Sequence, residues 1–260
     1  MTNEPRVQHD LPTYELGGGP LTLLLVHPLG ADGAFWQEVQ GLLADRYRTI
    51  AYDRRGSGQS PAPTRPWTLD DHARDLDVLC DSLGLEAVVP IGVAAGAMVA
   101  ARFSASHPHR VRGLILSNPM LAMTDAANEV LAARGRKGRE EGMAALAEDV
   151  IAAAFQGLDQ QSRREFYRQR FVLNDPVAYE LTHLGMQSAS ILDDLRRIKV
   201  PTAVVSGVHD PMVTLEMARE AASLLSDSYF QEIPEASHLP PVQNPEGFVR
   251  AVEPLLRSLG

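Results

Sequence analysis

The sequence predicts an α/β protein in which a mostly parallel sheet is flanked by helices and interrupted by an inserted helical lid. Apolar runs such as residues 21–27 lack polar alternation, as expected for strands buried on both faces of a parallel sheet. These runs alternate with segments of helical spacing, which favours helices on both faces of the sheet. Between about 120 and 198 the strands stop and the chain is rich in Ala, Arg, Glu and Gln. We therefore expect a core formed by residues 1–119 and 199–260, with a lid at 120–198.

Apolar patterns and turn residues place the individual elements. Strands are expected at residues 21–27, 48–53, 87–92, 112–118, 202–207 and 229–234. A helix should begin after Thr68, whose side chain can form a capping box with Asp71. Gly84 suits the left-handed position that ends such a helix. A second helix of small residues, at about 94–107, follows the third strand directly.

Composition limits the classes of function. The chain has 260 residues, 45% of them hydrophobic, which is enough for a sizeable core. It carries 24 Lys and Arg against 33 Asp and Glu, and this formal charge of −9 argues against a nucleic-acid or anionic-membrane surface. The first residues are polar and the apolar runs are only strand-sized, so neither a signal peptide nor a membrane span is expected.

The single cysteine, Cys80, excludes an intrachain disulfide and a cysteine-based metal cluster. This fits a reducing compartment, and we expect a cytoplasmic location. The histidines are scattered, with no His-x-x-x-His pair beside an acidic partner, so no metal site is expected. No glycine fingerprint for a dinucleotide follows the first strand, and the sequence predicts no cofactor.

The segment Gly92-Val93-Ala94-Ala95-Gly96 joins the third strand to the small-residue helix. This is the frame of a nucleophile elbow, a sharp turn that holds its central residue in a strained conformation above the sheet. A glycine two residues before the centre and another two residues after it let strand and helix approach closely. The pentapeptide alone is a weak signal, because strand-to-helix turns rich in Gly and Ala are common in α/β proteins.

Other motifs stand at the ends of the predicted strands. The first strand ends at His27-Pro28-Leu29-Gly30, and the second is followed by Asp53-Arg54-Arg55-Gly56-Ser57-Gly58-Gln59-Ser60. After the predicted lid come Gly207-Val208-His209-Asp210 and then Ala236-Ser237-His238. With these motifs in this order, residues 20–118 and 199–258 resemble the α/β-hydrolase superfamily, and in particular its 3-oxoadipate enol-lactonase-like branch.

This resemblance implies roles for four residues. Asp210 would orient His238, and His238 would act as the general base. The backbone N–H groups of Leu29 and Ala95 would form an oxyanion hole, which stabilises negative charge that develops on a carbonyl oxygen. Because Pro28 has no N–H group, Leu29 is the donor expected on its loop.

Ala94 departs from the family pattern at the nucleophile position, where the family carries Ser and sometimes Cys or Asp. A methyl group can neither attack a carbonyl carbon nor hold an acyl group. The chain is either a variant in which Ala replaces a nucleophile to trap a substrate, or a natural member that works without a covalent intermediate. In the second case His238, together with Asp210, could activate water or take a proton from the substrate.

Several further residues have both a functional and a structural interpretation. His27 is expected to hydrogen-bond the loop that shapes the oxyanion hole, and Asp53-Arg54-Arg55 to pin loops through ion pairs. Trp36 could face the site or anchor its helix, and His183 could line the substrate pocket or only pack within the lid. A group of lid cations is expected to form a solvated helix face, with a carboxylate anchor as the alternative: Arg134, Arg136, Lys137 and Arg139.

The sequence thus favours an enzyme that hydrolyses a small carbonyl compound at an ester, lactone or carbon–carbon bond, in a pocket closed by the lid. A lyase or cofactor-free oxygenase that uses His238 and Asp210 for proton abstraction is the alternative, since it needs no hydroxyl at position 94. A ligand-binding protein without activity is a third hypothesis, although a protein that only binds needs neither His238 nor Asp210. The expected partner is a small-molecule substrate, not nucleic acid or a membrane, and no feature indicates an oligomeric state.

Overall fold

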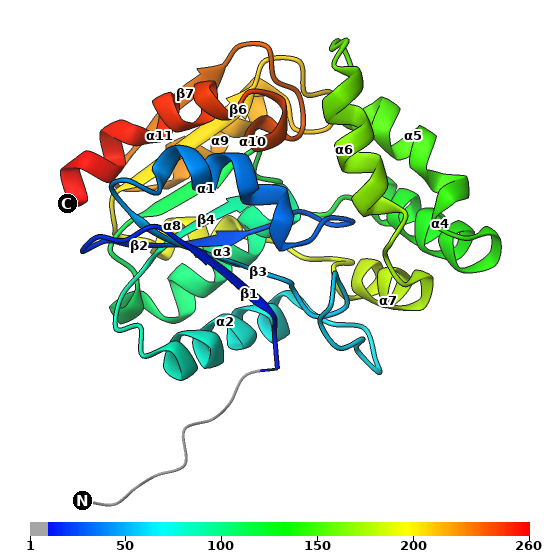
Figure 1. The fold of residues 1–260 in the computed structure, drawn as a ribbon, viewed down its shortest axis with the longest axis horizontal. Coiled ribbons are helices and arrows are strands. Elements are labelled where there is room, and N and C mark those ends of the chain that lie inside the picture. The colour runs from blue at the N-terminus through cyan, green and yellow to red at the C-terminus, as the bar shows by residue number, and fades with distance from the viewer. Residues whose placement is uncertain (1–9) are drawn as a thin grey trace, which may run out of the picture.

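A seven-stranded sheet forms the centre of the protein in a computed structural model, which describes residues 10–260 (Figure 1). The strand order is β1-β3-β2-β4-β5-β6-β7, and all neighbours are parallel except β1 and β3. The strands are β1 (Thr13–Leu16), β2 (Thr22–Val26), β3 (Arg48–Tyr52), β4 (Val89–Val93), β5 (Leu114–Ser117), β6 (Thr202–Gly207) and β7 (Ser228–Ile233). The six predicted strands are confirmed, but β1 was missed because this short edge strand is partly exposed and has no apolar run.

Helices cover both faces of the sheet, and β2 shows why its sequence is apolar throughout. Leu23 and Leu25 belong to the core cluster on one face, which also contains Val39 and Phe248. Leu24 and Val26 belong to the cluster on the other face, which also contains Leu76 and Val99. The core helices are α1 (Gln37–Leu43), α2 (Leu69–Leu83), α3 (Ala95–Ser106), α9 (Leu215–Leu224), α10 (Pro240–Gln243) and α11 (Pro245–Leu259), with short 3-10 turns at Gly33–Trp36 and Pro108–Arg110.

The predicted limits of α2 are confirmed by its two ends. Thr68 Oγ1 accepts a hydrogen bond from the N–H of Asp71, and the Asp71 carboxylate accepts one from the N–H of Thr68. At the other end Gly84 has φ 64°, a left-handed conformation that glycine adopts without strain. The helix therefore starts and stops where its local sequence satisfies the unpaired backbone groups.

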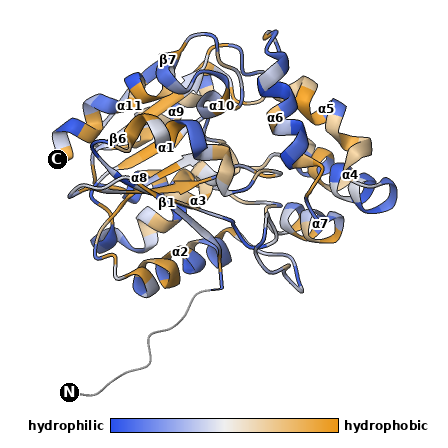
Figure 2. Ribbon diagram, in the orientation of Figure 1, coloured by the Kyte–Doolittle hydropathy of each residue, from blue (hydrophilic) through white to orange (hydrophobic). Residues whose placement is uncertain are grey.

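The insertion between β5 and β6 is helical, as predicted. It comprises α4 (Asp125–Glu141), α5 (Ala144–Ala154), α6 (Gln161–Phe171), α7 (Pro176–Gly185) and α8 (Leu192–Arg197). Figure 1 shows α4 to α7 grouped beside one end of the sheet, while α8 returns to the core and contacts α3 and α9. The central strands of the sheet are mainly hydrophobic, whereas α6 on the outside of the lid is largely hydrophilic (Figure 2).

No helix among residues 10–260 combines the length and the hydropathy needed to cross a membrane.

Candidate active site

A sharp turn at Ala94 connects β4 to α3. Ala94 has φ 51° and ψ −115°, a conformation that is strained for any residue with a side chain. Its N–H donates to the carbonyl of Ser117 at 3.0 Å, which ties the turn to the end of β5. A Cβ atom at Gly92 would lie 2.2 Å from the Gly96 carbonyl oxygen, and one at Gly96 would lie 2.3 Å from that of Val26. The predicted elbow geometry is therefore present, with a methyl group at its centre.

His238 and Asp210 meet in the loops that follow β7 and β6. The His238 Nδ1–H group donates to Asp210 Oδ2 at 2.8 Å, which leaves Nε2 available on the cavity side of the ring. Burial acts to raise the pKa of Asp210, but His238, Asn118 and the backbone N–H of Met212 outweigh it and hold the pKa below its usual value. Asp210 is thus an ionised acceptor that fixes the tautomer and the direction of the imidazole.

Asn118 supports this pair and was not identified from the sequence. It follows β5 directly and has φ 48°. Its Nδ2 donates to Asp210 Oδ2 at 2.6 Å and to the carbonyl of Ser237 at 3.1 Å. Asn118 therefore holds the carboxylate and the loop of His238 together. The sequence feature that could have identified Asn118 is a polar residue at the end of a buried strand.

Gln243, in α10, is a second missed residue and lies beneath the loop of His238. Its Oε1 accepts from the N–H groups of Ser237 at 2.7 Å and Leu239 at 3.0 Å, on either side of His238. Its Nε2 donates to the Ala154 carbonyl at 2.8 Å, and the N–H of His238 donates to the same oxygen at 3.2 Å. The His238 loop is thereby attached to lid helix α5.

Leu29, in the loop after β2, lines the same cavity as Ala94. His27 Nε2 accepts from the N–H of Arg54 at 3.0 Å, so its Nδ1 carries the proton and donates to the Pro28 carbonyl at 2.8 Å. Burial, with the charge of Arg54, lowers the pKa of His27 well below its usual value, and the ring is neutral. His27 therefore supports this loop in the way that the sequence predicts.

The two candidate oxyanion-hole amides have no hydrogen-bond partner in the part of the chain that the structure describes. The N–H of Leu29 has no hydrogen-bond partner within residues 10–260. The N–H of Ala95 belongs to the first turn of α3, where amides have no partner inside the helix. Both residues line the same cavity as Ala94 and His238.

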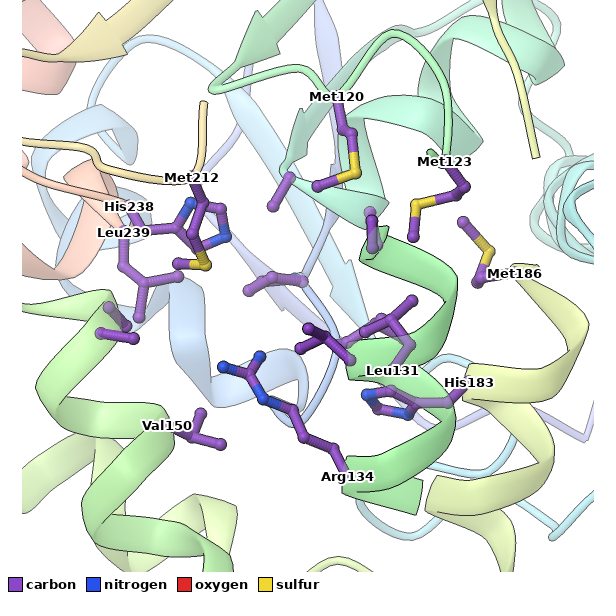
Figure 3. Close-up of a pocket in the computed structure, with 18 of the residues that line it drawn as sticks. Met120, Met123, Leu131, Arg134, Val150, His183, Met186, Met212, His238 and Leu239 are labelled. Carbon is purple, nitrogen blue, oxygen red and sulfur yellow. The ribbon is translucent and has the colours of Figure 1, made fainter. Parts of the chain in front are cut away.

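A cavity of about 560 Å³ lies between this end of the sheet and the lid, and its size is typical of small-molecule sites (Figure 3). Its wall is mainly apolar. Five methionines line it: Met98, Met120, Met123, Met186 and Met212. Figure 3 shows that Arg134, from α4, extends its guanidinium into this apolar space and away from His183.

Arg134 has different surroundings from the other lid cations. Arg139 pairs with Glu180 at 2.8 Å, Lys137 pairs with Asp149 at 3.3 Å, and Arg136 is exposed, as predicted for a solvated face. Arg134 instead lines the cavity and has no ion pair within the described chain. The expectation of a solvated face is wrong for this one residue.

His183 lines the cavity, whereas Trp36 does not. His183 is 2% exposed, and its Nδ1–H donates to the Tyr179 carbonyl at 2.8 Å. Burial lowers the pKa of His183 to about 4. Trp36 is fully buried against Phe35 and Phe248, with ring centroids 5.3 and 6.0 Å away. Of the two interpretations of Trp36, the structure therefore supports the anchor.

The expected ion pairs of the segment after β3 form at Arg55 alone. Arg55 pairs with Asp10 at 2.9 Å and with Asp75 at 3.2 Å. The Asp53 carboxylate instead accepts hydrogen bonds from backbone N–H groups, among them that of Gly33 at 2.7 Å. Arg54 has no ion pair within residues 10–260. Charge alone does not reveal which of three adjacent ionic residues points outward.

Comparisons with known proteins agree with this fold. A family model described as "alpha/beta hydrolase fold" matches residues 22–245. The "3-oxoadipate enol-lactonase 2" of Acinetobacter baylyi is 26% identical over 238 residues, which are 90% of this chain and 88% of that protein.

Two solved structures are similar over nearly their whole length. The enol-lactonase from Burkholderia xenovorans LB400 has a TM-score of 0.89 and 28% identity, with coverage of 95% of this chain and 96% of that one. A thermophilic esterase from Thermogutta terrifontis, solved with malate bound, has a TM-score of 0.88 and 30% identity over 96% of this chain and 93% of that one.

Proposed function

Because this chain belongs to the alpha/beta hydrolase fold family, we propose that it hydrolyses a small ester or lactone that carries a free carboxylate. The observation that carries the proposal is the 2.8 Å contact between His238 and Asp210 at a cavity that also contains two unpaired amides. Such a combination of an oriented base and an oxyanion hole is the machinery of acyl transfer. Similar chains named as enol-lactonases and an esterase support the ester and lactone class.

His238 and the two amides account for hydrolysis without a side-chain nucleophile. His238 Nε2 takes a proton from a water molecule, and the resulting hydroxide attacks the carbonyl carbon. The oxyanion accepts hydrogen bonds from the N–H groups of Leu29 and Ala95. When the tetrahedral intermediate collapses, the proton on His238 passes to the departing alkoxide. Asp210 stabilises the imidazolium that exists between these two transfers.

Arg134 supports a substrate with a carboxylate. A cation in an apolar cavity without an ion pair favours an anionic ligand, because partial burial weakens the competition from water. A 3-oxoadipate enol-lactone retains a carboxylate, and malate is a dicarboxylate, so the named relatives are consistent with this class. His183 lies in the same wall as a neutral hydrogen-bonding group.

A second candidate function is proton abstraction from substrate carbon by the same His238–Asp210 pair. Ala94 favours it, since a reaction of this kind needs no nucleophile at the elbow. The two functions differ in their response to Ala94→Ser. A restored hydroxyl should open an acyl-enzyme route for hydrolysis but leave a proton-abstraction reaction unchanged.

Turnover of 4-nitrophenyl hydrogen succinate and of its neutral methyl ester tests the proposal. We expect slow hydrolysis by the chain as it stands, complete loss in His238→Ala, and a rise of several orders of magnitude in Ala94→Ser, since deletion of a catalytic serine costs about 10⁶ in turnover elsewhere. Arg134→Gln should raise KM for the charged ester alone. Arg136→Gln, on the exposed side of α4, should leave KM for both esters unchanged.

Two outcomes contradict hydrolysis. If neither the unchanged chain nor Ala94→Ser hydrolyses any ester or lactone while carboxylates still bind, the protein is a binder. If a native reaction is lost in His238→Ala but unaffected by Ala94→Ser, the acid–base route replaces the hydrolytic one.

A further inference from the structure

Arg54 is a charged side chain that is buried without a partner of opposite charge among the described residues. Its exposure is 0%. Nη2 makes one long contact of 3.4 Å with the Pro28 carbonyl oxygen. Within residues 10–260, Nε and Nη1 have no hydrogen-bond partner. An uncompensated buried charge costs several kcal/mol of folding free energy, so it requires an explanation.

The groups around Arg54 do not neutralise it. Burial lowers the pKa of Arg54 to about 10, so the guanidinium remains charged at neutral pH. Burial also lowers the pKa of His27 and of His72 well below the usual value, and it raises the pKa of Tyr52. These three neighbours are therefore neutral, and one positive charge remains in the core.

Within residues 10–260, the single hydrogen bond of the Arg54 side chain is with the peptide unit that contains the Leu29 amide. The Pro28 carbonyl accepts from both His27 and Arg54, and its C=O bond points opposite to the N–H of Leu29 across a planar trans peptide. Donors on the carbonyl side polarise the peptide and make its N–H a stronger donor. Arg54 thus lies behind the loop, with the candidate oxyanion hole on the other side.

We propose that Arg54 is a positioning residue for the oxyanion hole, and that its charge is compensated only when negative charge develops on the substrate oxygen. This inference rests on the proposed function. It explains why a costly charge is kept at this place, since only interactions that strengthen in the transition state raise the rate of the chemical step.

The proposal predicts opposite effects on stability and activity. Replacement of an unpaired buried charge by an apolar side chain of similar length should stabilise the fold. The same replacement should lower kcat, because the Leu29 amide is less polarised. Replacement of a merely structural arginine would instead lower stability and leave kcat of the folded protein unchanged.

The test compares Arg54→Met, Arg54→Lys and the neighbouring control Arg55→Met. For the neutral 4-nitrophenyl ester we expect Arg54→Met to raise Tm and to lower kcat about tenfold or more, with little change in KM. This is less than the roughly 10²–10³ that removal of a whole oxyanion-hole donor costs. Arg54→Lys should recover most of kcat. Arg55→Met should lower Tm without this loss of kcat, because it breaks the ion pair with Asp75.

A second measurement does not need turnover. In the unliganded protein, the amide proton of Leu29 should move upfield in Arg54→Met and return in Arg54→Lys, whereas that of Ala95 should move less. If the Leu29 resonance stays in place, or if Arg54→Met lowers Tm and leaves kcat unchanged, Arg54 has only a structural role. Absence of ester hydrolysis together with the expected shift in Leu29 would contradict the proposed function and retain only the polarisation of the Leu29 amide by Arg54.

Discussion

Ala94 keeps a backbone conformation that its own side chain does not require. Left-handed or otherwise sparsely populated conformations cost about 1–3 kcal/mol in residues with a side chain. The close contacts of Gly92 and Gly96 and the hydrogen bond to Ser117 impose this conformation from outside. The surrounding residues therefore determine the elbow that the methyl group occupies. The backbone strain at Ala94 does not depend on a nucleophilic side chain.

Ala94→Gly should release this strain. We expect the free energy of unfolding to stay constant or to rise by about 1 kcal/mol, because relief of strain offsets the greater freedom of glycine in the unfolded chain. Ala97→Gly, in the first turn of α3 and also buried, is the matched control and should cost about 1 kcal/mol. Denaturant unfolding of both variants measures the difference, and equal losses would show that the elbow is not strained.

Asn118→Gly should raise the pKa of Asp210. Glycine tolerates the φ of 48° at this position, so the variant removes the amide donor without adding backbone strain. A hydrogen bond to a charged group contributes about 1.5–3 kcal/mol, and the pKa should rise by about one unit or more. Carboxyl ¹³C NMR titration of Asp210 measures this shift. A midpoint that does not move would mean that His238 and the backbone amides alone hold the carboxylate ionised.

Strands that are buried on both faces are predictable from the sequence, whereas a partly exposed strand at the edge of the sheet is not. β2 and β4 are apolar on both faces because helices cover both faces of the sheet. Their apolar sequences therefore predict buried strands. The short edge strand β1 has no such pattern, since half of it is exposed. The ends of α2 were predictable because the capping box and Gly84 act through local hydrogen bonds.

The placement of the candidate site residues was predictable where it depends on position in the fold, but not where it depends on packing. Asp210, His238, Leu29 and Ala95 stand at strand or helix ends, and the fold brings such ends together. Arg134 and Arg136 have the same charge, yet two residues along a helix turn the side chain through about 200°, so one faces the cavity and the other faces water. Only the packing of α4 decides which one faces the cavity.

Gln243 in α10 connects the loop of His238 to lid helix α5. Gln243→Leu should weaken the loop and its attachment to α5. The variant leaves the N–H groups of Ser237 and Leu239 without their acceptor, and a buried polar group without a partner costs about 1–3 kcal/mol. We expect a loss of this size in the free energy of unfolding, a fall in kcat, and faster amide hydrogen exchange at both residues. Unchanged exchange would show that the loop is held by other contacts.

The whole molecule should lose stability as the pH falls below about 6.5. Burial lowers the pKa of His27, His72 and His183, in the last case to about 4, so the unfolded chain binds protons that the folded chain does not. Stability is complete above the unfolded pKa and declines as pH falls towards the folded values. Each histidine contributes a slope of up to about 1.4 kcal/mol per pH unit.

Urea unfolding at pH 7, 6 and 5 measures this slope. His72→Phe should reduce it by about one histidine's contribution, because a neutral ring replaces the titrating one. His109→Gln, at an exposed position, should leave the slope unchanged. A slope that is the same in all three proteins would assign the acid sensitivity to other groups.

The five methionines of the cavity wall have a chemical consequence for the whole protein. Peroxide converts a thioether into a sulfoxide, which is polar and chiral, and so would make an apolar wall polar without breaking any backbone contact. Met120, Met123 and Met212 are partly exposed, whereas Met98 and Met186 are only 1% exposed, so oxidation would alter ligand recognition before it reached the core. Methionine sulfoxide reductases reverse this lesion, and the protein would regain its ligand without having to refold.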